Sequence, residues 1–137
     1  VNESMPLYIW KRIKKLMNKK KINIPKSKVL ILGYTFKENC PDIRNTKVQD
    51  LINYINKDLC HVDIYDPWIN KKDLPILKSI NFINNIKTKE YDCIIIAVAH
   101  KAFFGMGDKR ILSYSKKNRV IFDIKNVLKD NSLDGRL

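Results

Sequence analysis

A continuous apolar run at residues 93–99 constrains the fold of this chain more than any other feature. The run is far shorter than the ~20 residues that a membrane-spanning helix needs, and its length suits a buried strand. A second apolar run, at residues 29–32, stops at Gly33 in the same way. Strands that are apolar throughout occur in parallel sheets whose two faces are covered by helices, so these runs predict an α/β fold.

Segments with helical spacing alternate with these strands along the chain. Apolar residues recur at helical spacing in residues 7–17 and 46–56. Further elements are predicted as strands at 61–66, 81–86 and 119–124, and as short helices or turns at 72–79 and 108–115. Alternation of this kind builds right-handed βαβ units. The sequence therefore predicts a Rossmann-like three-layer fold with a mostly parallel sheet of about five strands, preceded by an N-terminal helix.

The chain carries a strong positive charge. Its 137 residues include 27 Lys and Arg against 14 Asp and Glu, which gives a formal net charge of +13. The basic residues form separate runs, at 11–21, 71–72 and 116–119, with apolar segments between them. This spacing favours solvated lysine faces and one anion-binding pocket over a nucleic-acid surface. A phosphate-bearing small molecule fits this charge as well as a polymer does, and a basic nucleic-acid-binding domain remains an alternative.

Three cysteines, Cys40, Cys60 and Cys93, form no Cys-x-x-Cys pair, and their odd number argues against a disulfide framework. Since only His61 and His100 could join them, we expect no metal site. The first residues lack the apolar core of a signal peptide, and the chain begins with Val rather than Met. We therefore expect a cytoplasmic fragment with no membrane partner.

The first strand-to-helix turn is expected to bind a ligand, because parallel sheets bind ligands beyond the carboxyl ends of their strands. The turn after Gly33 lacks the Gly-x-Gly-x-x-Gly pattern of dinucleotide-binding folds. It carries two cations instead, Lys37 and Arg44, which can bind an anion through their side chains. The residues alone leave open the alternative that these cations pair with Glu38 and Asp42 on the surface.

Two further polar residues follow predicted strands. Asp66 ends the strand at 61–66, and Pro67 after it favours strand termination or capping over ribose binding. His100 follows the strongest strand, on the ligand side of the sheet. It could reach a substrate, but a loop histidine bonded to the backbone is the preferred interpretation.

The loop after the first strand resembles that of a known family. It reads Phe36-Lys-x-x-x-x-Asp-x-Arg44 and is followed, after a helical segment, by Val62-Asp-Ile-Tyr-Asp-Pro67. Both segments resemble the C-terminal UDP-binding domain of the UDP-glucose/GDP-mannose dehydrogenase family. Residues 97–103, 122–128 and 134–137 are similar to the branch that oxidises UDP-N-acetylhexosamines. The resemblance covers essentially the whole chain.

The resemblance implies an activity and a domain plan. Members of this family use NAD to oxidise the C6 alcohol of a nucleotide sugar to a carboxylate. This reaction supplies uronic acids for surface polysaccharide biosynthesis. The resemblance implies that residues 1–24 form the end of an inter-domain helix and that residues 25–137 form the UDP-sugar-binding domain. Missing N-terminal and central domains would hold NAD and the catalytic groups, in a homodimeric enzyme. We expect Leu7, Trp10 and Met17 of the first helix to face that central domain, and a helix that packs on its own domain is the alternative.

The resemblance also carries functional residues onto this chain. Phe36, Lys37 and Lys125 match substrate-binding residues, and Arg44 matches an arginine that contacts NAD. The family's catalytic Cys lies in the central domain, so we expect no catalytic residue here and no activity from the chain alone. A non-catalytic nucleotide-binding or regulatory module is the alternative.

Overall fold

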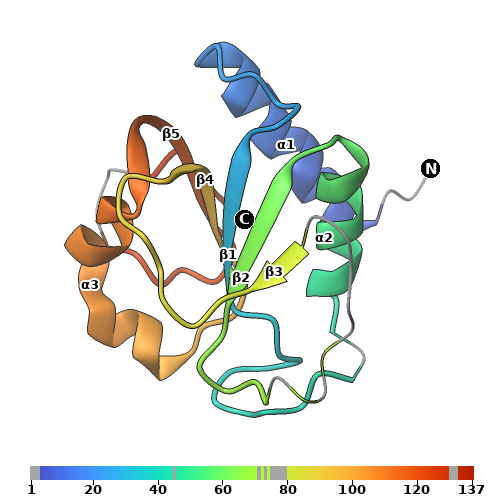
Figure 1. Ribbon diagram of the computed structural model, residues 1–137, viewed down its shortest axis with the longest axis vertical. Helices are drawn as coiled ribbons and strands as arrows, with labels where there is room; N and C mark the ends of the chain where they lie inside the picture. Colours follow the sequence, from blue (N-terminus) through green and yellow to red (C-terminus); the bar gives the residue numbers. More distant parts are fainter. Residues whose placement is uncertain (1–3, 45, 71, 73, 75–79, 130–132) are drawn as a thin grey trace.

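The computed structural model describes residues 4–44, 46–70, 72, 74, 80–129 and 133–137. Within them, six parallel strands form one sheet (Figure 1). The elements follow the order α1 (Met5–Lys19), β1 (Lys28–Leu32), α2 (Val48–Lys57), β2 (His61–Tyr65), β3 (Ile80–Phe82), β4 (Tyr91–Ile96), α3 (Lys101–Ser113), β5 (Ser115–Asp123) and β6 (Gly135–Arg136). The strands lie in the order β3-β2-β1-β4-β5-β6, with each neighbouring pair parallel. The Rossmann-like α/β fold predicted from the sequence is confirmed.

Helices cover both faces of the sheet. The helices α1 and α2 pack together on one face, and α3 lies on the other (Figure 1). The core under α1 and α2 includes Trp10, Met17 and Ile31, whereas the core under α3 includes Leu30 and Phe103. Successive side chains of β1 therefore enter opposite layers, as the alternation of a strand requires. This double burial explains why the strand is apolar throughout.

The buried stripe of α1 corrects one expectation. Trp10 and Met17 are 1% and 0% exposed, because α1 packs against α2 and β5 of this same domain. The indole Nε1 of Trp10 donates a hydrogen bond of 2.8 Å to Oδ2 of Asp58, which follows α2. Leu7 is partly buried. The expectation that these side chains face another domain is therefore wrong for Trp10 and Met17, whose helical spacing with Ile13 puts them on the core side.

The helix α3 begins earlier than predicted. The sequence favoured a loop at 100–107 and a short helix at 108–115, whereas α3 begins at Lys101 and passes through a break at Gly107, where φ is 79°. Its glycines weaken the helical signal in the sequence. Burial of Phe103 in the core, with 0% of its surface exposed, stabilises the first turns.

The two edges of the sheet also differ from the prediction. The strand β6 was not predicted, and it pairs with β5 beside Gly135, where an added Cβ would lie 2.7 Å from the ring of Phe122. At the opposite edge, β3 covers only the start of the strand predicted at 81–86. The short element predicted at 72–79 lies largely outside the described residues.

Several basic side chains at α1 have partners inside the domain. Lys14 Nζ lies 3.0 Å from an oxygen of Asp58, and Lys20 Nζ lies 2.6 Å from an oxygen of Asp134. Arg12 donates a 2.7 Å hydrogen bond to the carbonyl of Arg136 in β6. Part of the positive charge is therefore used to hold α1 on the sheet. None of the described helices combines the length and apolar character needed to cross a membrane.

The loops after β1 and β4 meet at the point where the strand order reverses. The strand β1 pairs with β2 on one side and with β4 on the other. Gly33 follows β1 with a φ of 100°, a conformation that side-chain-bearing residues rarely adopt. A Cβ at this position would lie 2.5 Å from Cβ of Val98 and 2.8 Å from its backbone nitrogen. Glycine therefore allows close contact between the two loops where such sheets bind ligands.

We expect Gly33→Ala to destabilise the protein strongly. The positive φ costs about 1–2 kcal/mol for a residue with a Cβ, and the collision with Val98 adds about 1–3 kcal/mol. Urea unfolding followed by circular dichroism should give a free energy of unfolding at least about 2 kcal/mol below that of the wild type. Gly105→Ala is the matched control, because nothing lies within 4 Å of its added Cβ. Equal effects of the two substitutions would contradict the assigned contact.

Candidate functional site

A pocket of about 290 Å³ opens at the carboxyl edge of the sheet. Its walls come from the start of α1, the loop at 33–47, the first turn of α2 and the residues that follow β4 and β5. Thr35, Ala97 and Val98 line it beside the junction of β1 and β4. The pocket therefore lies at the switch point, where a parallel sheet of this strand order binds its ligand.

The residues predicted to bind substrate all line this pocket. Phe36 and Lys37 come from the loop after β1, and Lys125 comes from the loop after β5. Because β4 separates β1 from β5, the two lysines reach the pocket from different sides. The ring of Phe36 is 53% exposed, so it offers an apolar face to a bound molecule. The structure brings these residues together, and their role in binding stays a prediction.

Arg44 is not among the residues that line the pocket. Its side chain is 85% exposed, and its Nε lies 3.0 Å from Oδ1 of Asp42. A second guanidinium nitrogen donates a 3.2 Å hydrogen bond to Oδ2 of the same carboxylate. These hydrogen bonds lower the pKa of Asp42 and raise that of Arg44. The surface pairing that the sequence left open for Arg44 is therefore present, and its role in NAD binding stays a prediction.

Local hydrogen bonds order the backbone around Lys37. The hydroxyl of Thr35 donates to the carbonyl of Lys37 over 3.0 Å. The N–H of Phe36 donates to the carbonyl of Asp42 over 2.7 Å, which closes the loop across its tip. The backbone of Lys37 is thus held while its side chain remains exposed.

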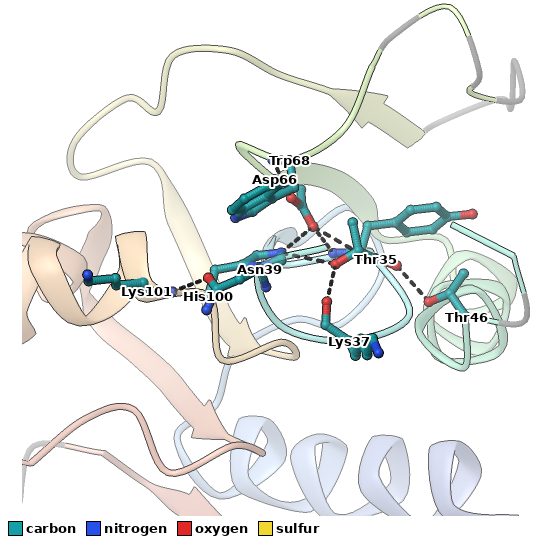
Figure 2. Close-up of polar contacts among 9 residues, drawn as sticks. Thr35, Lys37, Asn39, Thr46, Asp66, Trp68, His100 and Lys101 are labelled. Atoms are coloured by element: carbon teal, nitrogen blue, oxygen red, sulfur yellow. Dashed lines mark hydrogen bonds and ion pairs between the residues drawn. The ribbon is translucent and has the colours of Figure 1, made fainter. Parts of the chain in front are cut away.

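The carboxylate of Asp66 joins three segments beside this loop, as Figure 2 shows. Its Oδ2 accepts hydrogen bonds from the N–H groups of Tyr34 at 2.7 Å and Thr35 at 3.1 Å, and lies 2.8 Å from Nε2 of His100. Its Oδ1 accepts the N–H of Trp68 at 2.8 Å. The side chains of Asp66 and His100 are 0% exposed. Burial alone would raise the pKa of Asp66, but the hydrogen bonds from His100 and the backbone outweigh it and hold the pKa below its ordinary value.

Hydrogen-bond geometry defines the tautomer of His100. The N–H of Asn39 donates to Nδ1 over 2.9 Å, so Nδ1 carries no proton. The proton therefore sits on Nε2, which donates to Asp66. The sequence-based interpretations of Asp66 as a capping residue and of His100 as a histidine bonded to the backbone are confirmed. The direct contact between the two side chains was not predicted.

A second buried carboxylate, that of Asp123 at the end of β5, holds the loop that carries Lys125. Its Oδ1 accepts the N–H of Lys125 at 3.2 Å, and its Oδ2 accepts the N–H of Leu128 at 2.7 Å. A guanidinium nitrogen of Arg136 in β6 lies 3.6 Å from the same Oδ2. The sequence-based interpretation did not single out Asp123, and it gave Asp66 a terminating or capping role without its contact to His100. The available signal was an aspartate at the end of an apolar strand, on the side where the ligand was expected.

The cysteines suit a structural role. Cys60 and Cys93 are buried free thiols, and burial raises the pKa of both, which disfavours the reactive thiolate. Cys40 is half-buried in the loop at 33–47. No group of three or more His, Cys, Asp or Glu side chains that could hold a metal ion occurs in the part of the chain that the structure describes.

Solved dehydrogenases share this fold. The NDP-N-acetyl-D-galactosaminuronic acid dehydrogenase of Methanosarcina mazei Go1 matches with a TM-score of 0.77 and 24% sequence identity. The match covers 91% of this chain and 26% of that one. At this level of identity the likeness establishes the architecture.

Sequence comparison identifies the family. Over 137 residues the chain is 42% identical to the UDP-N-acetyl-D-glucosamine 6-dehydrogenase of Salmonella typhi and 37% identical to that of Pseudomonas aeruginosa. Each comparison covers 100% of this chain and 32% of the relative, so the chain spans about a third of the length of these curated relatives. The family model for the UDP-binding domain matches residues 30–130. The chain therefore belongs to the UDP-glucose/GDP-mannose dehydrogenase family, as its UDP-binding domain.

Proposed function

We propose that this chain binds the UDP part of a UDP-N-acetylhexosamine for an NAD-dependent 6-dehydrogenase. The observation that carries the proposal is that Lys37 and Lys125 line one pocket at the switch point of the sheet. Ammonium groups that face one pocket complement the charge of a diphosphate and donate charge-assisted hydrogen bonds to it. The exposed ring of Phe36 would contact an apolar face of the same ligand. Similarity to UDP-N-acetyl-D-glucosamine 6-dehydrogenases supports the choice of sugar.

The reaction that we propose is a two-step oxidation of the C6 alcohol to a uronic acid, for surface polysaccharide biosynthesis. The catalytic groups would lie in other domains of a longer polypeptide, since this chain aligns with only 32% of the length of such a relative. In this scheme residues 1–24 form the end of an inter-domain helix and residues 25–137 form the UDP-sugar-binding domain. The intact enzyme would be a cytoplasmic homodimer.

Arg44 is the residue that we propose to contact NAD. The chain has no Gly-x-Gly-x-x-Gly pattern, so most of the cofactor is assigned to an N-terminal domain. The guanidinium of Arg44 is exposed, and its partner Asp42 is a surface carboxylate. Solvent screens such an exposed ion pair, so opening it costs little free energy. The planar fork of Arg44 can then hold a phosphate through parallel hydrogen bonds.

Lys37→Met should weaken the binding of UDP to this chain. A hydrogen bond to a charged group contributes about 1.5–3 kcal/mol, which corresponds to a roughly ten- to hundredfold higher Kd. Isothermal titration of UDP into the wild type and the variant measures this difference. Lys57→Met, which removes the same charge from the exposed end of α2, is the matched control and should leave the Kd unchanged.

Two outcomes of this titration would contradict the proposal. In the first, Lys37→Met binds UDP as tightly as the wild type, which would remove Lys37 from the site. In the second, an oligonucleotide binds far more tightly than UDP and its affinity falls as the salt concentration rises, which would favour the nucleic-acid-binding alternative.

Arg44→Ala, placed in the full-length enzyme, should raise the KM for NAD more than the KM for the UDP-sugar. Lys37→Met should show the reverse pattern and serves as the reciprocal control. Arg44→Lys should restore little, because a point charge cannot reproduce the planar fork on a phosphate. Steady-state kinetics with each substrate varied in turn test this assignment, which is wrong if Arg44→Ala affects only the UDP-sugar.

The chain alone should form no NADH from NAD and any UDP-sugar. It lacks the nicotinamide-cofactor fingerprint, and burial disfavours the thiolates of Cys60 and Cys93. Absorbance at the NADH band, with the full-length enzyme as the positive control, provides the measurement. Turnover by the purified chain would overturn this prediction.

A further inference from the structure

The buried pair of Asp66 and His100 holds both ends of the segment 34–39. Asp66 accepts the N–H groups of the first residues of this segment, at 2.7 and 3.1 Å. His100 accepts the N–H of its last residue at 2.9 Å. Phe36 and Lys37 stand between these anchors, and both are exposed and line the pocket. Figure 2 shows Lys37 between Thr35 and Asn39. The segment that presents both residues is therefore fixed at both ends.

The bond to His100 holds Asn39 in a left-handed conformation. Its φ is 55°, in a region that most residues with a Cβ avoid and that Asn adopts more readily than most. Its side-chain oxygen accepts the N–H of Lys101 at 2.9 Å, which docks the segment onto the start of α3. The bond from its N–H to Nδ1 of His100 and the bond to Lys101 together stabilise this geometry.

Neither member of the pair is accessible to a ligand. Nδ1 of His100 accepts the backbone N–H of Asn39, and its Nε2 lies within hydrogen-bond distance of Asp66 and of the hydroxyl of Thr35. Both side chains are 0% exposed. Among the described residues, every buried polar side-chain atom has a hydrogen-bond partner. Any effect of the pair on ligand binding must therefore pass through the loop.

We propose that Asp66 and His100 are positioning residues of the nucleotide-sugar site, which set the place of Phe36 and Lys37 without touching the ligand. The inference rests on the proposed function, because UDP is the ligand whose affinity reports on the loop. An anchored loop presents the ammonium of Lys37 already in place. In a released loop the ammonium of Lys37 reaches the bound ligand only part of the time, so part of its roughly ten- to hundredfold contribution to affinity is lost and the Kd rises about tenfold.

The test separates the contacts of the pair. His100→Gln keeps a donor that can reach Asp66 but loses the acceptor for the N–H of Asn39. His100→Asn places an acceptor near the position of Nδ1 and loses the donor to Asp66. We expect His100→Gln to raise the Kd for UDP about tenfold and His100→Asn to recover part of the affinity.

Substitutions in β2 provide the matched comparison. Asp66→Asn removes the buried charge at the end of the strand and should also raise the Kd for UDP about tenfold. Asp63→Asn is the control, because this carboxylate lies in the same strand but accepts hydrogen bonds from Tyr91 and Asn81, away from the loop. It should leave the Kd unchanged. Near-ultraviolet circular dichroism establishes that each variant is folded before titration.

A double-mutant cycle distinguishes positioning from general stabilisation. If His100 acts by placing Lys37, then Lys37→Met should cost less affinity in the His100→Gln chain than in the wild type. A purely structural role would give additive effects. Amide hydrogen exchange supplies a readout without UDP: exchange of segment 34–39 should accelerate in His100→Gln while β1 and β4 stay protected.

The outcomes are separable. Additive effects in the cycle, an unchanged Kd for Asp66→Asn and His100→Gln, or unchanged exchange of segment 34–39 would each overturn this inference and leave the proposed function intact. A wild-type chain that does not bind UDP would overturn the proposed function and this inference with it.

Discussion

The pairing of β1 with β2 on one side and with β4 on the other determines where every candidate functional group of this chain lies. Because all these strands are parallel, the segments that follow them meet at a single edge of the sheet. The close approach of Gly33 to Val98 brings the central loops together at that edge. The pocket, the exposed lysines and the buried carboxylates are all consequences of this one arrangement.

Buried carboxylates, more than the lysines themselves, define the geometry of the site. A lysine has a long and flexible side chain, so its own contacts fix its position weakly. Asp66 and Asp123 each accept backbone N–H groups at the base of a lysine-bearing loop. Releasing either loop would leave a buried charge without its hydrogen bonds, which is costly. The loops are thereby tied to the core of the domain.

Sequence patterns could predict what depends on local composition. The apolar runs at 29–32 and 93–99 identify buried strands, and the loop motif with Lys37 and Arg44 identifies the candidate site. The start of α3 and the strand β6 depend on tertiary contacts, and were missed. The contact between Asp66 and His100 joins residues 34 positions apart, so it follows only from the strand order. The pairing of Arg44 with Asp42 stayed open because surface ion pairs are weak and depend on rotamers.

The sheet sets the distance between the bases of the two loops that carry Lys37 and Lys125. The loops of Lys37 and Lys125 begin at β1 and β5, and β4 lies between these strands. Neighbouring strands are separated by about 4.8 Å, so the bases of the two loops are about 10 Å apart. Backbone hydrogen bonds maintain this spacing, and side-chain substitutions in the loops leave it unchanged. The span between the two points of attachment is therefore inherited from the backbone, and the flexible side chains of the two lysines must reach across it to engage one ligand together.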